Sequence, residues 1–394
     1  MRPLNVPAAV SMGEADLSVL AAFGADSAIM ERLQTAQLAK HLILVEAVRR
    51  RSGEEAQASF RTLAALQQDA PKQMAELLTL PQVGCWAVDS LQRLNEGRGL
   101  DLRYLNAFAT GAAFHTGRPW TRAEESGTLQ LPGLGTLTAH QWTPIPRIQA
   151  AAGGLKLSVR LDATDPYLTG FGPRGDADLH WWGTELKATW DILTQRHRRT
   201  AEALAKGFTT LVPLLMSDVG ISMSATSGWA YGAIALSPPT DLLSFAESLV
   251  HESQHMVLGA VEDLVRLTEP DDGRRWYAPW RSDPRPLSAL LQGCYASLGM
   301  AGFWRAEYRR GPARSRARAE IEFAYRRAIT WETICRLASS GGLTHFGGIF
   351  VAAMRDRLRP WLDEPVSSPA EQQATRRRSE HRVRWQQLNP GHAL

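Results

Sequence analysis

The stretch from Thr240 to Arg266, TDLLSFAESLVHESQHMVLGAVEDLVR, carries the strongest pattern in the chain. Its apolar residues recur every three to four positions, which predicts one long amphipathic helix. These residues are Leu242, Phe245, Leu249, Val250, Met256, Val257, Val261 and Leu264. Thr240 is the expected N-cap, because its hydroxyl can accept a hydrogen bond from a free backbone N–H of the first turn. The segment 231–236 reads as a strand that leads into this helix.

Within this helix lies the motif His251-Glu252-Ser253-Gln254-His255, an HExxH sequence. Residues four apart on a helix lie one above the other on the same face. The two imidazoles can therefore reach one metal ion, each through one ring nitrogen. The pattern predicts that His251 and His255 are metal ligands and that Glu252 lies beside the metal.

The third protein ligand is not fixed by the motif. The metzincin extension, HExxHxxGxxH, requires glycine at 258 and histidine at 261, but this chain has Leu258 and Val261. In a straight helix, Asp263 would lie about 12 Å further along the axis than His255, too far for the same ion.

Gly259 offers a way to bring a carboxylate back toward the histidines. Glycine commonly ends a helix in the left-handed conformation, and a turn at Gly259 would return the chain toward the metal. We therefore expect Asp263 to be the third ligand. Glu262 and His345 remain the alternative candidates.

Two histidines and one carboxylate are the usual ligands of a non-haem Fe(II) oxygenase. A similar set with a bound water also makes a hydrolytic zinc site, in which Glu252 would be the general base. The motif alone does not decide between iron and zinc.

The rest of the chain predicts a mainly helical α+β protein. Residues 13–105 show helical periodicity, and 104–114 adds a short helix. Residues 128–138 read as a hairpin, 155–161 as a strand, 181–206 as a helix and 221–236 as two strands. Helices follow a loop at 269–286. The expected organisation is a helical N-terminal region (1–125), an α+β metal-binding catalytic region (126–364) with a small sheet, and a basic polar tail (365–394).

Composition narrows the class of protein. The 394 residues are 44% hydrophobic, with 44 Lys+Arg against 40 Asp+Glu. A globular chain with so small a net charge is not expected to bind nucleic acid broadly. Three widely separated cysteines, Cys85, Cys294 and Cys335, favour a reducing cytoplasm over a disulfide framework. No apolar run is long enough to predict a membrane span, and the N-terminus does not read as a signal peptide.

The sequence around the motif resembles the bacterial HEXXH motif proteins that are encoded beside ribosomally made, modified peptides. The likeness rests on three stretches near the motif: 249–255 (LVHESQH), 276–287 (WYAPWRSDPRPL) and 291–298 (LQGCYASL). It extends to 39–44 (AKHLIL), 131–135 (LPGLG) and 341–344 (GGLT), so it covers most of the chain.

Members of that family are 2-oxoglutarate-dependent peptide β-hydroxylases. The resemblance implies Fe(II) and 2-oxoglutarate as cofactors and a precursor peptide as substrate. The distal carboxylate of 2-oxoglutarate needs a cationic partner, and arginine pairs with a carboxylate bidentately. We expect Arg281 and Arg285, in a proline-flanked loop, to bind it, unless one of them pairs with Asp283 or Glu269 instead. Glu252 would then support the metal ligands.

Two other functions stay open from the residues alone. One is a zinc metallopeptidase that uses Glu252 as general base. The other is a non-catalytic module that recognises a leader peptide or another peptide-maturation enzyme through the helical N-terminal region.

Overall fold

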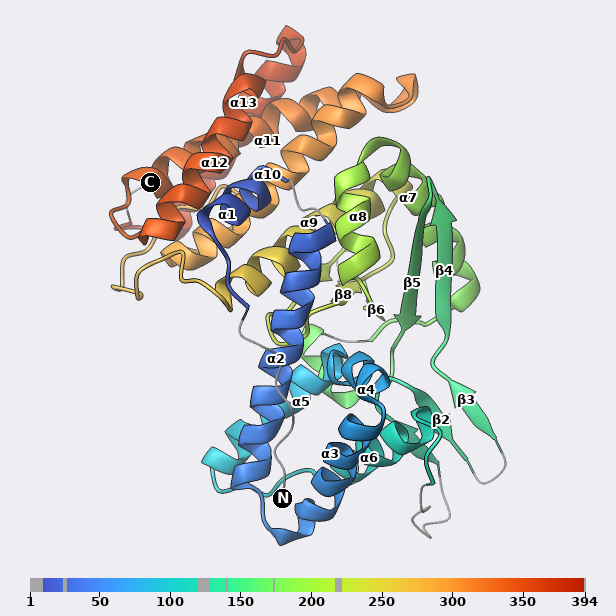
Figure 1. Ribbon diagram of the computed structural model, residues 1–394. Helices are drawn as coiled ribbons and strands as arrows, with labels where there is room; N and C mark the ends of the chain where they lie inside the picture. The colour runs from blue at the N-terminus through green and yellow to red at the C-terminus, as the bar shows by residue number, and fades with distance from the viewer. Residues whose placement is uncertain are drawn as a thin grey trace.

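A computed structural model describes residues 10–23, 27–119, 128–138, 141–172, 174–216 and 222–392. These residues form a mainly helical protein with two small sheets, which confirms the predicted fold class (Figure 1). The boundary predicted near residue 125 and the first nine residues lie outside the described ranges.

The N-terminal helices form a core of their own at the lower end of the molecule (Figure 1). They are α2 (Ser27–Arg51), the short η1 (Glu54–Ala56), α3 (Gln57–Asp69), α4 (Pro71–Leu78), α5 (Pro81–Asn95) and α6 (Leu102–His115). Prolines begin α4 and α5, where a missing N–H costs nothing because the first turn has no acceptor for it. Buried residues between Leu42 and Ala113 fill the space between these helices.

The first helix and the start of α2 belong to a second, larger core. Helix α1 (Glu14–Ala21) lies among the C-terminal helices in Figure 1 and packs against α12. Ile29, Met30 and Leu33 of α2 join the same apolar cluster as the sheet and the C-terminal helices. Helix α2 therefore connects the two cores, and it carries Lys40 between them.

Two sheets follow α6. Strands β1 (Leu129–Leu131), β2 (Gly135–Leu137) and β3 (Trp142–Pro144) form an antiparallel sheet, which confirms the hairpin predicted at 128–138. The second sheet has the order β4-β5-β6-β8-β7. Its strands are β4 (Arg147–Ala152), β5 (Leu155–Leu161), β6 (Thr210–Pro213), β7 (Ser224–Ala225) and β8 (Ala233–Leu236).

The second sheet is mixed. Strands β5, β6 and β8 run parallel, whereas β4 and β7 are antiparallel to their neighbours. Every residue of β6 and β8 is buried, as is usual for parallel strands covered on both faces. A short η2 (Pro166–Phe171) precedes α7 (Leu179–Arg196) and α8 (Arg198–Gly207), which pack on this sheet together with α9.

The predicted helix at 181–206 is two helices, α7 and α8. His197 interrupts it with a non-helical backbone (φ −129°, ψ 46°). Its Nε2 lies 2.7 Å from the Oε1 of Glu307, a fully buried carboxylate that also accepts a bond from Arg196. This contact with a distant helix fixes the break.

The remaining helices form the upper part of the molecule in Figure 1, apart from the first of them, which lies near the middle. They are α9 (Leu242–Glu262), α10 (Leu287–Arg310), α11 (Ala313–Ser339), α12 (His345–Leu362) and α13 (Ser368–Leu388). The predicted basic tail thus forms a helix. Helix α13 packs on α11, and its Arg377 and Arg378 pair with glutamates of α11. Its residues Ala370, Ala374 and Trp385 are buried, Trp385 against Tyr277.

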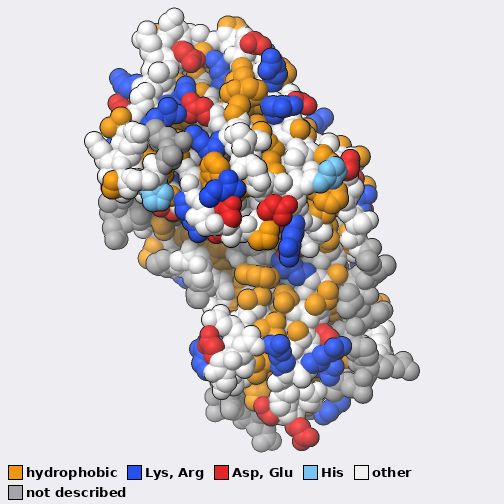
Figure 2. Space-filling view, turned by 90° about the vertical axis from the view of Figure 1, so that its left-hand side faces the viewer, with side chains coloured by type: hydrophobic (Ala, Val, Ile, Leu, Met, Phe, Trp, Pro, Cys, Tyr) orange, Lys and Arg blue, Asp and Glu red, His pale blue; other side chains and the backbone are white. Residues whose placement is uncertain are grey.

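No helix of the described ranges is long and apolar enough to cross a membrane. On the face drawn in Figure 2, Lys and Arg side chains are interspersed with Asp and Glu side chains. That face therefore carries no broad area of one charge.

His41 gives the fold a dependence on pH. Its ring is fully buried on α2, its Nδ1 lies 2.7 Å from the carbonyl of Leu78, and burial lowers its pKa to about 4. The unfolded chain takes up a proton here near pH 6.5, and the folded chain does not, so stability falls as pH drops from 6.5 to 4. We expect this group to cost about 2 kcal/mol between pH 7 and pH 5.

Urea unfolding at both pH values, with His41→Gln as the comparison, measures this effect. The variant should lose about 2 kcal/mol less stability between pH 7 and pH 5 than the wild type does. An equal loss in both proteins would show that His41 does not cause the dependence.

Candidate metal centre

Helix α9 carries the HExxH motif as one continuous helix. Its N-cap is Asp241, not the predicted Thr240: the carboxylate accepts the backbone N–H of Ser244 at 2.9 Å. A carboxylate is well placed there because it also faces the positive end of the helix dipole. The buried face of α9 packs on the sheet and on α10, so the motif lies on a rigid element.

The two histidines converge. The Nε2 atoms of His251 and His255 lie 3.2 Å apart, and the ring planes are nearly perpendicular, at 80°. Two nitrogens bonded to one metal at about 2.0–2.1 Å lie roughly 3 Å apart at tetrahedral or octahedral angles. The pair thus fits two ligands of a single divalent ion.

His251 is held in its neutral form. Desolvation, the neighbouring His255 and the guanidinium of Arg326 lower the pKa of His251 to about 3, although 31% of its side chain stays exposed. A neutral imidazole keeps the lone pair that a metal needs. The buried Nδ1 of His251 has no hydrogen-bond partner in the described part of the chain.

His255 is oriented by a glutamine that the motif did not reveal. Its Nδ1 donates to Oε1 of Gln292 on α10 at 3.1 Å, and Nε2 of Gln292 donates in turn to Glu262. Because Nδ1 carries the proton, Nε2 is free to bind a metal. Such a partner fixes both the tautomer and the ring plane of a ligand.

Replacing Gln292 with leucine should weaken metal binding by roughly 10- to 100-fold, because His255 loses the acceptor that orients it. Gln254→Leu is the matched control, since that neighbour of His255 packs its stem against Gly299 on α10. Metal titration of both variants measures the effect. Equal affinity in the Gln292 variant and the wild type would mean that the ring is held by packing alone.

Glu252 lies close to the pair, as predicted. Its side chain is only 2% exposed and accepts a hydrogen bond from the Oγ of Ser224 on β7 at 2.6 Å. Oε1 of Glu252 lies 3.8 Å from Nε2 of His251. Burial raises the pKa of Glu252, and the hydroxyls of Ser224 and Thr226 oppose that shift.

The expected turn at Gly259 is absent. Helix α9 continues through it to Glu262, and the backbone N–H of Asp263 donates to the carbonyl of Gly259 at 3.2 Å. Asp263 therefore stays at the far end of the helix. Its Oδ2 accepts bonds from Lys40 at 2.7 Å and from Gln37 at 2.9 Å.

The other candidate ligands are also engaged elsewhere. Glu262 accepts from Gln292, and exposed His345 lies on α12, where its Nε2 is 2.8 Å from Glu14. Among the described residues, no group of three His, Cys, Asp or Glu side chains is close enough to hold one metal. Asp263 and Glu262 line the same cavity as the histidines but do not form a metal-binding group with them, so the prediction of Asp263 as third ligand needs correction.

Arg281 and Arg285 lie in one loop with their predicted competitor. Arg281 donates through Nε to Asp283 at 3.0 Å, and Arg285 donates through Nη1 to the same carboxylate at 2.9 Å. The arginines thus share Asp283, as the alternative predicted, and they also line the cavity that contains the histidines. Two guanidinium groups share one carboxylate, which leaves one positive charge in excess among these three side chains.

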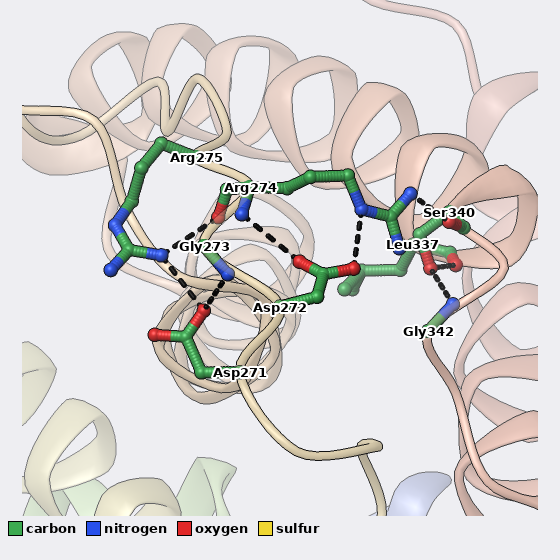
Figure 3. Close-up of polar contacts among 8 residues, drawn as sticks. All are labelled: Asp271, Asp272, Gly273, Arg274, Arg275, Leu337, Ser340 and Gly342. Carbon is green, nitrogen blue, oxygen red and sulfur yellow. Dashed lines mark hydrogen bonds and ion pairs between the residues drawn. The ribbon is translucent and has the colours of Figure 1, made fainter.

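The loop at 269–286, which carries Arg281 and Arg285 and is called the arginine loop, is held by hydrogen bonds. The backbones of Trp276 and Arg285 exchange two hydrogen bonds, of 2.8 and 2.9 Å. Upstream, the side chain of Arg274 donates a hydrogen bond to the carbonyl of Ser340 at 2.8 Å. The carboxylate of Asp272 accepts hydrogen bonds from both the backbone N–H and the side chain of Arg274 (Figure 3). The bond to Ser340 ties the loop to the C-terminal end of α11, and the other bonds close the loop on itself, so the arginines are presented from a fixed backbone.

An open cavity of about 930 Å³ brings these groups together. It is lined by α2, by β7 and the turn after it, by α9, by the arginine loop, and by α10 and α11. The polar side chains that the motif did not point to include Gln37, Lys40, Ser224, Glu247, Gln292 and Arg326. Lys40 and Gln292 do fall within stretches that carry the resemblance.

No model of a known protein family matches the chain, and a search of curated proteins gave no significant match.

Proposed function

We propose that the protein is an Fe(II)- and 2-oxoglutarate-dependent oxygenase that hydroxylates a side chain, at Cβ, of a ribosomally made precursor peptide. The observation that carries the proposal is the convergence of distant segments at one cavity. Lys40, the histidine pair, the arginine loop and Gln292 all line it, and they come from four of the stretches that carry the resemblance.

The two histidines fit two of the positions around the metal. His251 and His255 would hold it through Nε2, with Gln292 fixing the ring of His255. With two nitrogen ligands, and Glu252 beside them, positions remain open for a co-substrate that binds through two oxygens. Iron bound there with 2-oxoglutarate supplies the oxidising power for a C–H bond.

The chain's own residues would bind and orient. The excess positive charge of Arg281 and Arg285 suits the distal carboxylate of 2-oxoglutarate, which would share their N–H donors with Asp283. The cavity is larger than such a small diacid needs and is open, so it leaves room for a peptide side chain. Glu252, which accepts a hydrogen bond from Ser224, would help to keep the side chains of the two histidine ligands in position.

A second function has one observation in its favour. The carboxylate of Glu252 is buried, has a raised pKa and lies 3.8 Å from the Nε2 of His251. These are properties of a general base, as a zinc metallopeptidase requires. In that function Glu252 would take the proton of the attacking water.

Glu252→Gln distinguishes the two functions. The amide keeps a hydrogen-bonding group of the same size but cannot accept a proton. A peptidase should lose about two to four orders of magnitude in rate. The proposed oxygenase should keep a measurable fraction of its turnover, since no general base is needed. Rates and metal content should be measured together, with Ser253→Ala as the control, because among the described residues the Ser253 hydroxyl bonds only the carbonyl of Val250 in its own helix.

A further inference from the structure

The edge of the five-stranded sheet opens into the same cavity. Strand β7 is the last strand and pairs on one side with β8. No strand of the described ranges pairs with its other side. Ser224, Ala225 and Thr226 line the cavity, so the free side of the strand faces the space above the histidines.

The register shows which backbone groups are free. The carbonyl of Met223 accepts the N–H of Ser237, and Ala225 lies opposite Ala235. In an antiparallel pair, alternate residues turn their N–H and C=O groups to the same neighbour. Met223 and Ala225 therefore face β8. By the same alternation Ser224, and Thr226 directly after β7, turn their backbone groups to the open side.

Two successive contacts connect the edge of β7 to the proposed metal ligand His251. Ser224 reaches Glu252 at 2.6 Å, and Glu252 lies 3.8 Å from His251. A further strand would lie about 4.8 Å from β7 in the hydrogen-bonding direction. It would thus run across the side of α9 that carries the histidines. Opposite residues of paired strands point to the same face, so the residue paired with Ser224 would direct its side chain toward α9.

We propose that the substrate peptide binds as an extended strand that pairs with the open edge of β7. This inference rests on the proposed function and names how its peptide substrate is held. The occupant is an unstructured peptide segment, because only a free backbone can supply the N–H and C=O groups that Ser224 and Thr226 require. Alternate residues of such a peptide would direct their side chains into the cavity, toward α9.

The test is a binding measurement on the full-length protein as isolated. A 12-residue peptide is first selected by display from a random library. Unlabelled peptide must displace the labelled peptide, which shows that both bind one saturable site. Each backbone nitrogen of that peptide is then methylated in turn. Pairing with this edge predicts losses of at least about fivefold at the two peptide positions opposite Ser224 and Thr226, which are two residues apart, and little loss at the position between them. Losses without that alternation, or a library that yields no binder, would overturn the proposal.

Two variants of Thr226 test whether the peptide binds at the edge of β7. Thr226→Pro removes the outward N–H, which edge strands tolerate, whereas Thr226→Val removes only the hydroxyl. The proline variant should bind about tenfold more weakly than the valine variant, with equal thermal stability. Equal binding would place the peptide elsewhere. Turnover is not read, so a failure of the iron chemistry would leave this result intact.

Discussion

Replacing either His251 or His255 with alanine is expected to abolish the binding of one divalent metal ion per chain. The two Nε2 atoms are 3.2 Å apart, and no third His, Cys, Asp or Glu among the described residues joins them. A single imidazole cannot hold the ion against water and buffer. The loss should exceed the roughly 100-fold cost of removing a group that merely orients a ligand.

Elemental analysis of each purified variant measures this. His345→Ala is the matched control, because that histidine is exposed and lies beside Glu14 on the surface. It should keep the metal content of the wild type. Circular dichroism checks that both alanine variants keep the helical fold. Full metal content in both would contradict the metal centre and every enzymatic function built on it.

Removing both arginines of the loop is expected to have the second largest effect. A charge-assisted pair with a carboxylate contributes about 1.5–3 kcal/mol, or roughly 10- to 150-fold in affinity. Arg281→Ala or Arg285→Ala alone should weaken 2-oxoglutarate binding by this order. The double variant should weaken 2-oxoglutarate binding further. In each single variant the remaining guanidinium, which also pairs with Asp283, partly compensates for the one removed. Iron binding should stay intact.

Lysine at either position should recover only part of the loss, because an ammonium cannot present two parallel donors. Arg275→Ala is the control in the same loop, where the guanidinium pairs with exposed Asp271. Titration of 2-oxoglutarate into each iron-loaded variant, without oxygen, gives the affinities. Wild-type binding in both single variants and in the double variant would assign the arginines a structural role.

Local patterns predicted the elements well where no distant contact intervenes. The strand at 155–161 and the hairpin around Pro132 and Gly133 follow from alternation and turn residues, and both are present. Helix α9 follows from its periodicity. In these segments the residues that set the conformation are neighbours in the chain.

Long-range contacts account for the differences. Gly259 does not end α9, because packing of the helix on the sheet and on α10 outweighs the local preference of glycine. Lys40 holds Asp263 from 223 positions away, which no local pattern encodes. His197 breaks a regular helical pattern because its ring reaches Glu307. The pairing of Gln292 with His255 likewise depends on how α10 packs on α9.

The candidate site was predicted in part. The histidines, Glu252 and the two arginines were found from the motif and the resemblance, and all five line one cavity. The third ligand was not, because its prediction depended on a helix end that packing removed.

Succinate formation tests the central claim most directly. Protein loaded with Fe(II) without oxygen should show a change in its absorption spectrum on addition of 2-oxoglutarate. After oxygen is admitted it should form succinate, and His251→Ala should form none above the level without protein. A fully iron-loaded wild type that forms no succinate, alongside zinc-loaded protein that cleaves a peptide without any co-substrate, would contradict the proposed oxygenase.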